Sequence, residues 1–107
     1  MAQFKEQKIE ELLAHLAAEY LRNESNRTSL ITVTGAKVSS RFTKVTIMIT
    51  VFPETKEVAA LDFVRRQRRE FKEYLKSHSR LQRLPLVDFE IDLGEKNRQR
   101  IDELGRS

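Results

Sequence analysis

Apolar residues near the start of the chain recur at the spacing of one helix face. They follow steps of three or four positions: Ile9, Leu12, Leu13, Leu16, Ala17, Tyr20 and Leu21. This spacing is typical of an amphipathic helix, because positions three and four apart lie on the same side of an α-helix. We therefore expect a helix over residues 4–21, followed by a loop in the polar stretch 22–29.

The period then changes from helical to alternating. Residues 30–39 are rich in β-branched side chains, which favour strands. Residues 43–52 alternate strictly between the two faces of a strand. Their shared apolar face consists of Val45, Ile47, Ile49 and Val51. The two segments predict an antiparallel hairpin with a short turn at residues 39–41.

The first of these strands contains a change of phase. Ile31 and Val33 share one face, whereas Ala36 and Val38 would lie on the other face of a regular pleat. Gly35 stands where the phase changes, and an isolated glycine within a strand is typical of a bulge. We therefore expect a bulge or bend at this glycine.

Helical periodicity returns after Pro53, which ends the second strand because it has no backbone N–H to donate. The pattern predicts helical sequence over residues 56–78. The expected inward residues are Val58, Leu61, Val64, Phe71, Tyr74 and Leu75. After Val64, however, the next inward turn carries Gln67 and Arg68. Either one long helix has a polar notch there or two helices meet at a bend, and periodicity alone does not separate the two.

A third strand is predicted over residues 86–92, after Pro85. Its apolar face carries Val87, Phe89 and Ile91, and its polar, solvent-facing side carries Asp88, Glu90 and Asp92. Because each strand has one apolar face, helices should cover the sheet on one side only. The order of elements predicts a single two-layer α+β domain over residues 1–93. Residues 94–107 are expected to form a charged, flexible tail.

Composition excludes several classes of protein. A chain of 107 residues, 39% of them hydrophobic, corresponds to one domain. No apolar run approaches the roughly 18 residues of a membrane-spanning helix, so we expect no membrane partner. The absence of cysteine excludes disulfides, thiolate metal sites and cysteine nucleophiles, and it suits a cytoplasmic protein.

Residues that could carry catalysis are scattered. His15 and His78 are the only histidines, and their spacing is not that of metal ligands. Gly35, Gly94 and Gly105 are isolated, so there is no glycine-rich phosphate loop. No serine lies in a nucleophile elbow. We expect a protein that is not an enzyme and that needs neither metal nor cofactor.

Positive charge is concentrated in one segment. Residues 63–83 contain eight cations and two carboxylates, a net charge of +6, whereas the whole chain carries +4. The candidate RNA-binding residues are Arg65, Arg66, Arg68, Arg69, Lys72, Lys76, Arg80 and Arg83. A cationic segment on a slightly acidic body predicts a polyanionic partner. The alternative is an ordinary solvated helix face.

The spacing of these cations adds detail. If helix persists to residue 83, six of them lie on one face opposite the packing surface: Arg65, Arg69, Lys72, Lys76, Arg80 and Arg83. Such a row suits backbone phosphates, which supply affinity without reading base identity. Because few aromatic residues lie nearby, we expect recognition of RNA shape and backbone more than stacking on single strands.

Four stretches of the sequence together resemble the ribosome-binding factor A family. They are LITVTGAKVS (30–39), TKVTIMITVF (43–52), RLQRLPLVDFEID (80–92) and RIDEL (100–104). With the first amphipathic helix, the similarity spans nearly the whole chain. No single motif is diagnostic, so the order and spacing of all of them carry the resemblance.

The resemblance implies a type II KH-like domain with the order α-β-β-α-kink-α-β. KH domains elsewhere hold the nucleic-acid backbone with a GXXG loop, which this family replaces by a kink built on Ala-x-Gly. The corresponding positions here are Gln67, Arg68 and Arg69, so both the alanine and the glycine are missing. We expect the helix to bend near Gln67, with extra cationic contact to RNA in place of the glycine.

Members of this family assist maturation of the small ribosomal subunit, which they bind during processing of the 5′ end of 16S rRNA, notably in the cold. The resemblance therefore implies a cytoplasmic assembly factor that binds the small subunit through 16S rRNA, and we expect it to be a monomer. One alternative is a general KH-like protein that binds messenger or transfer RNA. Another is a protein-interaction module with a basic surface.

Overall fold

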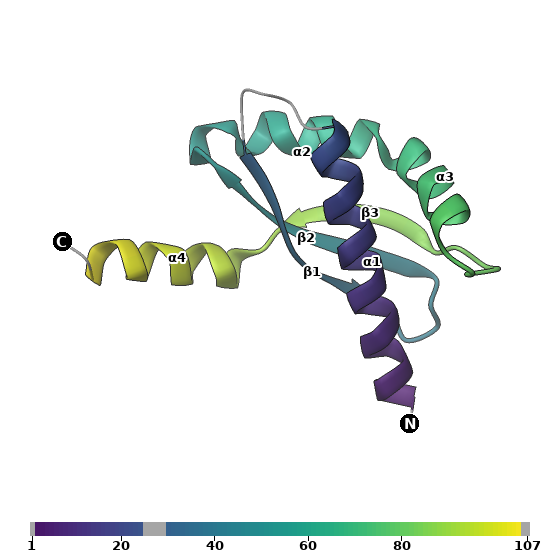
Figure 1. The fold of residues 1–107 in the computed structure, drawn as a ribbon. Coiled ribbons are helices and arrows are strands. Elements are labelled where there is room, and N and C mark those ends of the chain that lie inside the picture. Colours follow the sequence, from purple (N-terminus) through teal and green to yellow (C-terminus); the bar gives the residue numbers. More distant parts are fainter. Residues whose placement is uncertain (1, 25–29, 106–107) are drawn as a thin grey trace.

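Three helices pack on one face of a three-stranded sheet in the computed structural model, which describes residues 2–24 and 30–105 (Figure 1). The elements are α1 (Ala2–Glu24), β1 (Leu30–Val38), β2 (Lys44–Phe52), the 3-10 turn η1 (Glu54–Lys56), α2 (Glu57–Arg66), α3 (Arg68–His78), β3 (Leu86–Ile91) and α4 (Leu93–Gly105). The predicted α+β class and the order of the first six helices and strands are confirmed. The first helix continues past its predicted end at residue 21, and residues 25–29 of the predicted loop lie outside the described part.

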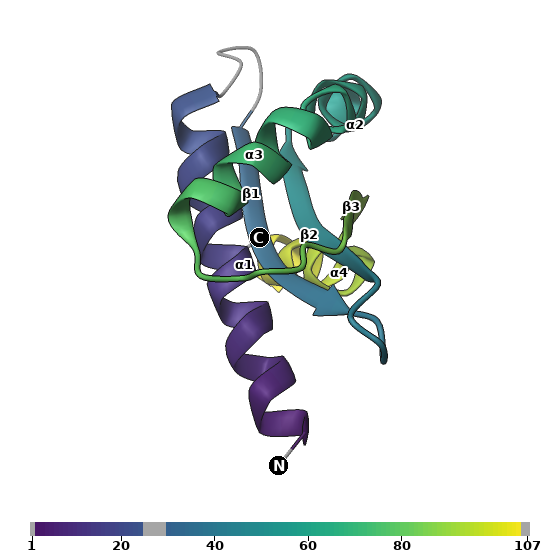
Figure 2. The same cartoon turned by 90° about the vertical axis from the view of Figure 1, so that its right-hand side faces the viewer.

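The sheet has β2 at its centre, antiparallel to β1 and parallel to β3. Val45, Ile47 and Ile49 on β2 are fully buried. A parallel pair needs a long crossover connection, and α2 and α3 supply it across the covered face. Figure 2 shows α3 crossing in front of α1 and the sheet. The alternation along β2 therefore predicted the buried face correctly.

The irregularity in β1 lies at the predicted place. Val33 pairs with Ile49 and Gly35 pairs with Met48, so Thr34 is the extra residue of a bulge. Thr34 is half-buried, and its hydroxyl donates a hydrogen bond of 2.6 Å to Oδ2 of Asp92. The bulge thus joins β1 to the residue that precedes α4.

Aromatic residues connect the layers of the core. The ring of Phe71 on α3 lies 5.3 Å from that of Tyr20 on α1 and 6.0 Å from that of Phe89 on β3. One expected inward residue was wrong, because Val58 is 74% exposed. The α-helix begins only at residue 57, and the buried face of α2 is formed instead by Ala60 and Val64, one turn apart.

Helix α4 occupies most of the segment that was expected to be a flexible tail, and it projects away from the sheet (Figure 1). Its first turn is capped by Asp92, whose Oδ1 accepts the backbone N–H of Glu95 at 3.0 Å. Lys96 pairs with Glu57 at 3.0 Å. Sequence periodicity missed this helix because a cap and ion pairs hold it, while its residue Ile101 is 67% exposed. The division into a domain over residues 1–93 and a separate tail stays a prediction.

The cap at Asp92 predicts a dependence of stability on pH. The hydrogen bonds from Thr34 and from the backbone of Glu95 hold the pKa of Asp92 below its ordinary value. A lowered pKa in the folded state stabilises the protein above about pH 4, and this stability is lost as the pH falls further. Thr34→Val should therefore lower the free energy of unfolding more at neutral pH than at about pH 2.5, measured by urea denaturation. Thr32→Val, at an exposed position of the same strand, is the control. An equal loss for Thr34→Val at both pH values would contradict the role of Asp92.

No helix in the described part of the chain is long and apolar enough to cross a membrane.

Candidate nucleic-acid interface

The helical segment breaks at one residue, Gln67. Its backbone angles are φ −95° and ψ 5°, and its N–H bonds to the carbonyl of Val64, three residues back, at 3.0 Å. Negative φ in this bridge region is open to any residue, so the break does not depend on a glycine. The predicted bend is confirmed, and an unbroken helix from residue 56 to 78 is excluded.

A contact from α1 holds the break. The hydroxyl of Tyr20, a residue only 7% exposed, donates a hydrogen bond of 2.7 Å to Oε1 of Gln67. The polar residue that interrupts the apolar pattern is half-buried, and its side-chain carbonyl therefore has a hydrogen-bond partner inside the fold. Sequence reasoning could not find this bond, because the two residues are 47 positions apart.

Removing the hydroxyl tests this contact. Tyr20→Phe should cost about 0.5–1.5 kcal/mol of unfolding free energy, since it also leaves the Gln67 carbonyl without this donor. Tyr74→Phe is the matched control, because it removes a tyrosine hydroxyl that donates at 3.1 Å to Glu19, away from the helix break. Urea denaturation of both variants measures the difference. A loss in the control as large as that in Tyr20→Phe would contradict a special role for the Gln67 contact.

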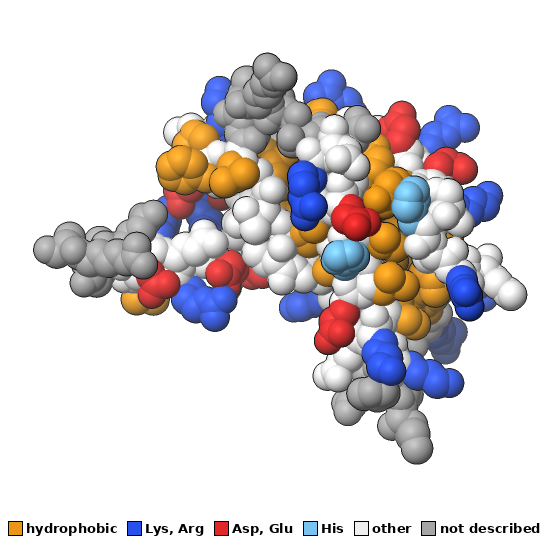
Figure 3. Space-filling view, viewed as in Figure 1, with side chains coloured by type: hydrophobic (Ala, Val, Ile, Leu, Met, Phe, Trp, Pro, Cys, Tyr) orange, Lys and Arg blue, Asp and Glu red, His pale blue; other side chains and the backbone are white. Residues whose placement is uncertain are grey.

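The break divides the predicted RNA-binding residues into three groups, which we call together the basic surface. Two lie at the end of α2 (Arg65 and Arg66), four on α3 (Arg68, Arg69, Lys72 and Lys76) and two in the loop before β3 (Arg80 and Arg83). The helix α3 ends at His78, where the periodicity predicted the end of the helical sequence. The condition for one helix face that reaches residue 83 is therefore not met, and Arg80 and Arg83 lie beyond the helix. All eight side chains are exposed or half-buried. In Figure 3, Lys and Arg side chains rim the side of the molecule where α3 lies, with acidic groups among them.

Two of the arginines already pair with a carboxylate within the protein, and a third, Arg66, donates from Nε to the backbone carbonyl of Asp62 at 3.3 Å. Arg65 Nε lies 3.3 Å from Oδ1 of Asp88, and its Nη2 donates to the carbonyl of Phe89 at 3.0 Å. Arg68 Nη1 lies 3.6 Å from the same Oδ1, while its Nε donates to the carbonyl of Arg65 at 3.0 Å. These contacts place the guanidinium groups of Arg65 and Arg68 beside the helix break. The sequence placed Asp88 on a solvated face and gave no sign of this pairing, which depends on how α2 meets the edge of β3.

An open hollow of about 560 Å³ lies beside this cluster. It is lined by Lys44, Arg68, Arg69, Lys72, Leu86, Val87 and Asp88, which makes four cations and one carboxylate. Lys44 comes from β2, where it pairs with Leu86 of β3. Sequence reasoning missed it, because it lies far along the chain from the cationic segment. A concave surface of one predominant charge raises the local concentration of oppositely charged ligands.

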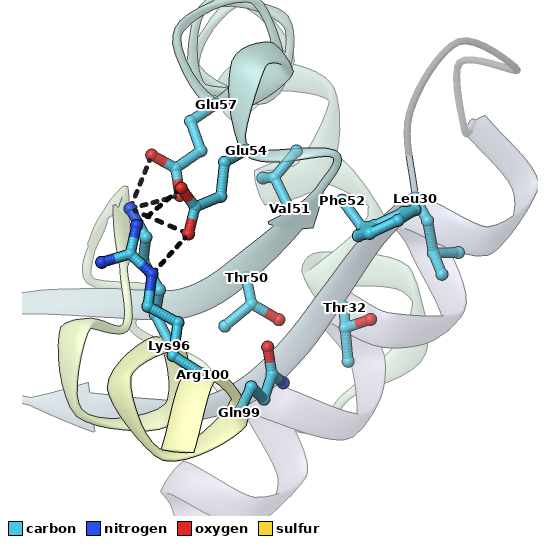
Figure 4. Close-up of a pocket in the computed structure, with 10 residues that line it drawn as sticks. All are labelled: Leu30, Thr32, Thr50, Val51, Phe52, Glu54, Glu57, Lys96, Gln99 and Arg100. Atoms are coloured by element: carbon cyan, nitrogen blue, oxygen red, sulfur yellow. Dashed lines mark hydrogen bonds and ion pairs between the residues drawn. The ribbon is translucent and has the colours of Figure 1, made fainter. Parts of the chain in front are cut away.

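A second pocket, beside α4, has a different character (Figure 4). It has a volume of about 430 Å³, with Leu30 and Phe52 on its apolar side. Its two cations already face carboxylates, since Lys96 lies 3.9 Å and Arg100 2.7 Å from Glu54. The hydrogen bond from Arg100 holds the pKa of Glu54 below its ordinary value. With its charges compensated internally, this pocket is a weaker candidate for an anionic ligand than the basic surface.

The chemistry that the basic surface offers is binding. Arginine and lysine donate charge-assisted hydrogen bonds to phosphate oxygens without transferring a proton. Within residues 2–24 and 30–105, no three metal-binding side chains come together. The arrangement can therefore position a polyanion along α3 and the helix break.

Comparisons with known proteins agree with the fold. A crystal structure of ribosome-binding factor A from Thermus thermophilus superimposes with a TM-score of 0.72 at 24% identity, covering 80% of this chain and 94% of that one. A homology model of the Thermus thermophilus factor, fitted into a cryo-EM map of a 30S–RbfA complex, gives 0.70 at 24% identity, covering 79% and 92%. A solution NMR structure of a putative ribosome binding factor A from Thermotoga maritima gives 0.65 at 17% identity, covering 78% and 82%.

Sequence comparison gives the family. No curated protein matches the chain. The family model for ribosome-binding factor A, in contrast, matches residues 5–105, which include every described strand, nearly all of the first helix and all of the last. The chain therefore belongs to the ribosome-binding factor A family.

Proposed function

We propose that this protein binds the small ribosomal subunit through 16S rRNA and assists its maturation without catalysing a reaction. Within the family, the fitted complex of the Thermus thermophilus factor with the 30S subunit supports this partner. Binding would favour one conformation of the immature subunit, and the protein would leave as processing of the 5′ end of the rRNA is completed. We expect it to act as a cytoplasmic monomer and to matter most in the cold, when RNA misfolds readily.

The observation that carries the proposal is the cationic hollow beside the helix break. Arg69 and Lys72 project from α3, and Lys44 reaches the same hollow from the neighbouring strand. Cations from separate elements around one concave surface suit the curved sugar-phosphate backbone of RNA. Such contacts set the position of the protein, while the shape of the RNA selects the site.

The individual residues have different roles in this proposal. Arg66, Arg69 and Lys76 are exposed and would contact phosphates directly. Arg65 and Arg68 would offer the edges of their guanidinium groups that Asp88 does not occupy. Arg80 and Arg83, in the loop before β3, would extend the contact along the RNA.

The dependence of binding on salt tests whether RNA phosphates are the ligand. Labelled protein is titrated with isolated small subunits at about 50 and 200 mM salt, and the affinity is measured by fluorescence anisotropy. Six to eight phosphate contacts predict a loss of about 10³-fold or more between these conditions. A change of less than about threefold would indicate a protein partner and would contradict the proposal.

A further inference from the structure

One carboxylate, Asp88, lies among the cations of the basic surface. It comes from β3, its side chain is 24% exposed, and it lines the same hollow as Arg68, Arg69 and Lys72. An acidic residue within a surface that is proposed to bind RNA weakens that surface for phosphates that approach the carboxylate. Its presence there calls for a physical explanation.

We infer that Asp88 is a specificity-determining residue, which suppresses binding of the basic surface to arbitrary RNA. This inference rests on the proposed function. The carboxylate competes with RNA phosphates for Arg65 and Arg68. A phosphate therefore binds these guanidinium groups fully only when the RNA presents it on the side that faces away from Asp88. RNA of another shape meets a surface whose charge is partly neutralised.

The contacts of Asp88 support this role. Its Oδ1 accepts the backbone N–H of Phe89 at 2.8 Å, and Arg65 Nε and Arg68 Nη1 lie 3.3 and 3.6 Å from the same oxygen. The carboxylate is therefore held in place by its own strand and does not depend on the arginines for its position. Its Oδ1 lies against one nitrogen of each guanidinium group, where the oxygen of a bound phosphate would otherwise lie.

Repulsion also acts beyond the paired arginines. A fixed negative charge in a half-buried site is screened less than one in open solvent, because the protein wall has a low dielectric constant. A phosphate of unrelated RNA that approaches Arg69 or Lys72 from the side of the hollow that Asp88 lines therefore meets the field of this carboxylate. Specificity of this kind comes from weakening the wrong complexes more than the right one.

The variant Asp88→Asn separates the effect of the negative charge of Asp88 from the effect of its hydrogen bonds. The amide keeps an oxygen that can accept from Phe89 and Arg65, but it removes the negative charge. Glu90→Gln is the matched control, because it makes the same change in charge at an exposed residue two positions along β3 that does not line the hollow. Both variants and the unchanged protein are titrated against small subunits and against an RNA hairpin unrelated to 16S rRNA.

The expected result is a loss of discrimination. Asp88→Asn should bind the unrelated hairpin about fivefold more tightly and small subunits less than twofold more tightly, whereas Glu90→Gln changes both by less than about twofold. Asp88→Asn is also made in a protein in which Arg65 and Arg68 are both changed to Gln. There it should raise hairpin affinity by about half as much as it does when both arginines are present, or less. Asp88→Ala, which also removes the acceptor, should still strengthen hairpin binding if charge is what matters.

Two results would overturn the inference without touching the proposed function. One is salt-dependent binding of small subunits together with unchanged hairpin affinity in Asp88→Asn. The other is weaker hairpin binding in Asp88→Ala with no gain in Asp88→Asn, which would make Asp88 a support for the arginines only. Failure of the unchanged protein to bind small subunits would instead contradict the proposed function itself.

Discussion

Reversing three cations of the basic surface, Arg66, Arg69 and Lys76, to glutamate should abolish binding to the small subunit while leaving the fold intact. All three are exposed. Each loses its charge-assisted bond to a phosphate and adds a repulsive charge. If each contact contributes about 1 kcal/mol or more, the three together weaken binding by at least about 100-fold. Fluorescence anisotropy with small subunits measures the loss.

The choice of residues follows from the structure. The sequence alone gives no reason to leave out Arg65 and Arg68, which belong to the same cationic segment. Arg65 and Arg68, however, lie against Asp88, so glutamate there would place like charges side by side and disturb the helix break. The variant without them separates loss of binding from loss of folding.

A control with the same net charge isolates the position of the cations. Changing Lys5, Arg41 and Lys56 to glutamate lowers the net charge by the same amount at exposed sites on α1, the hairpin turn and η1. This control should lose less than about tenfold in affinity, because none of its three residues lines the cationic hollow. Equal losses in both variants would show that only total charge matters. Undiminished binding by the variant with Arg66, Arg69 and Lys76 reversed would place the interface elsewhere, and unfolding of that variant would show that these side chains have a structural role.

Ile47→Asp should prevent the chain from folding. Ile47 is fully buried on the central strand, where it pairs with Ala36 of β1 and Phe89 of β3. An aspartate there has no partner for its charge, and burying it costs several kcal/mol on top of the lost packing. Because small domains are stable by about 5–15 kcal/mol, the variant should show no cooperative thermal transition by circular dichroism. Val45→Asp or Ile49→Asp, on the same face, should have the same effect.

Two control variants test whether the loss of folding comes from the buried charge. Ile47→Val removes one methylene and should cost about 0.5–1.5 kcal/mol. Thr32→Asp places the same carboxylate on the exposed face of the neighbouring strand and should change stability by about 0.5 kcal/mol or less. A folded Ile47→Asp would contradict the position of this residue in the core.

The sequence predicted those features that depend on local pattern. Strict alternation over β2 identified the buried face, and the change of phase around Gly35 identified the bulge. The polar interruption at Gln67 marked the helix break. Each of these features appears within a few residues, where the apolar pattern either follows the period of a strand or helix or departs from it. A single sequence is therefore enough to predict them.

The features that it missed depend on contacts between distant elements. Tyr20 meets Gln67 only because α1 packs across the break. Asp88 was assigned to solvent, although α2 brings Arg65 to it around the edge of β3. Helix α4 lacks a strong apolar face and is held by the cap at Asp92. No periodicity signals such pairings.

Sedimentation with ribosomal subunits shows whether this protein binds the small subunit specifically, as we propose. Purified protein is centrifuged with isolated small or large subunits at about 50 and 200 mM salt, alongside the variant with Arg66, Arg69 and Lys76 reversed. We expect the protein to pellet with small subunits only, less at the higher salt, and the variant not to pellet with either subunit. Equal pelleting with both subunits, or with neither, would contradict the proposal.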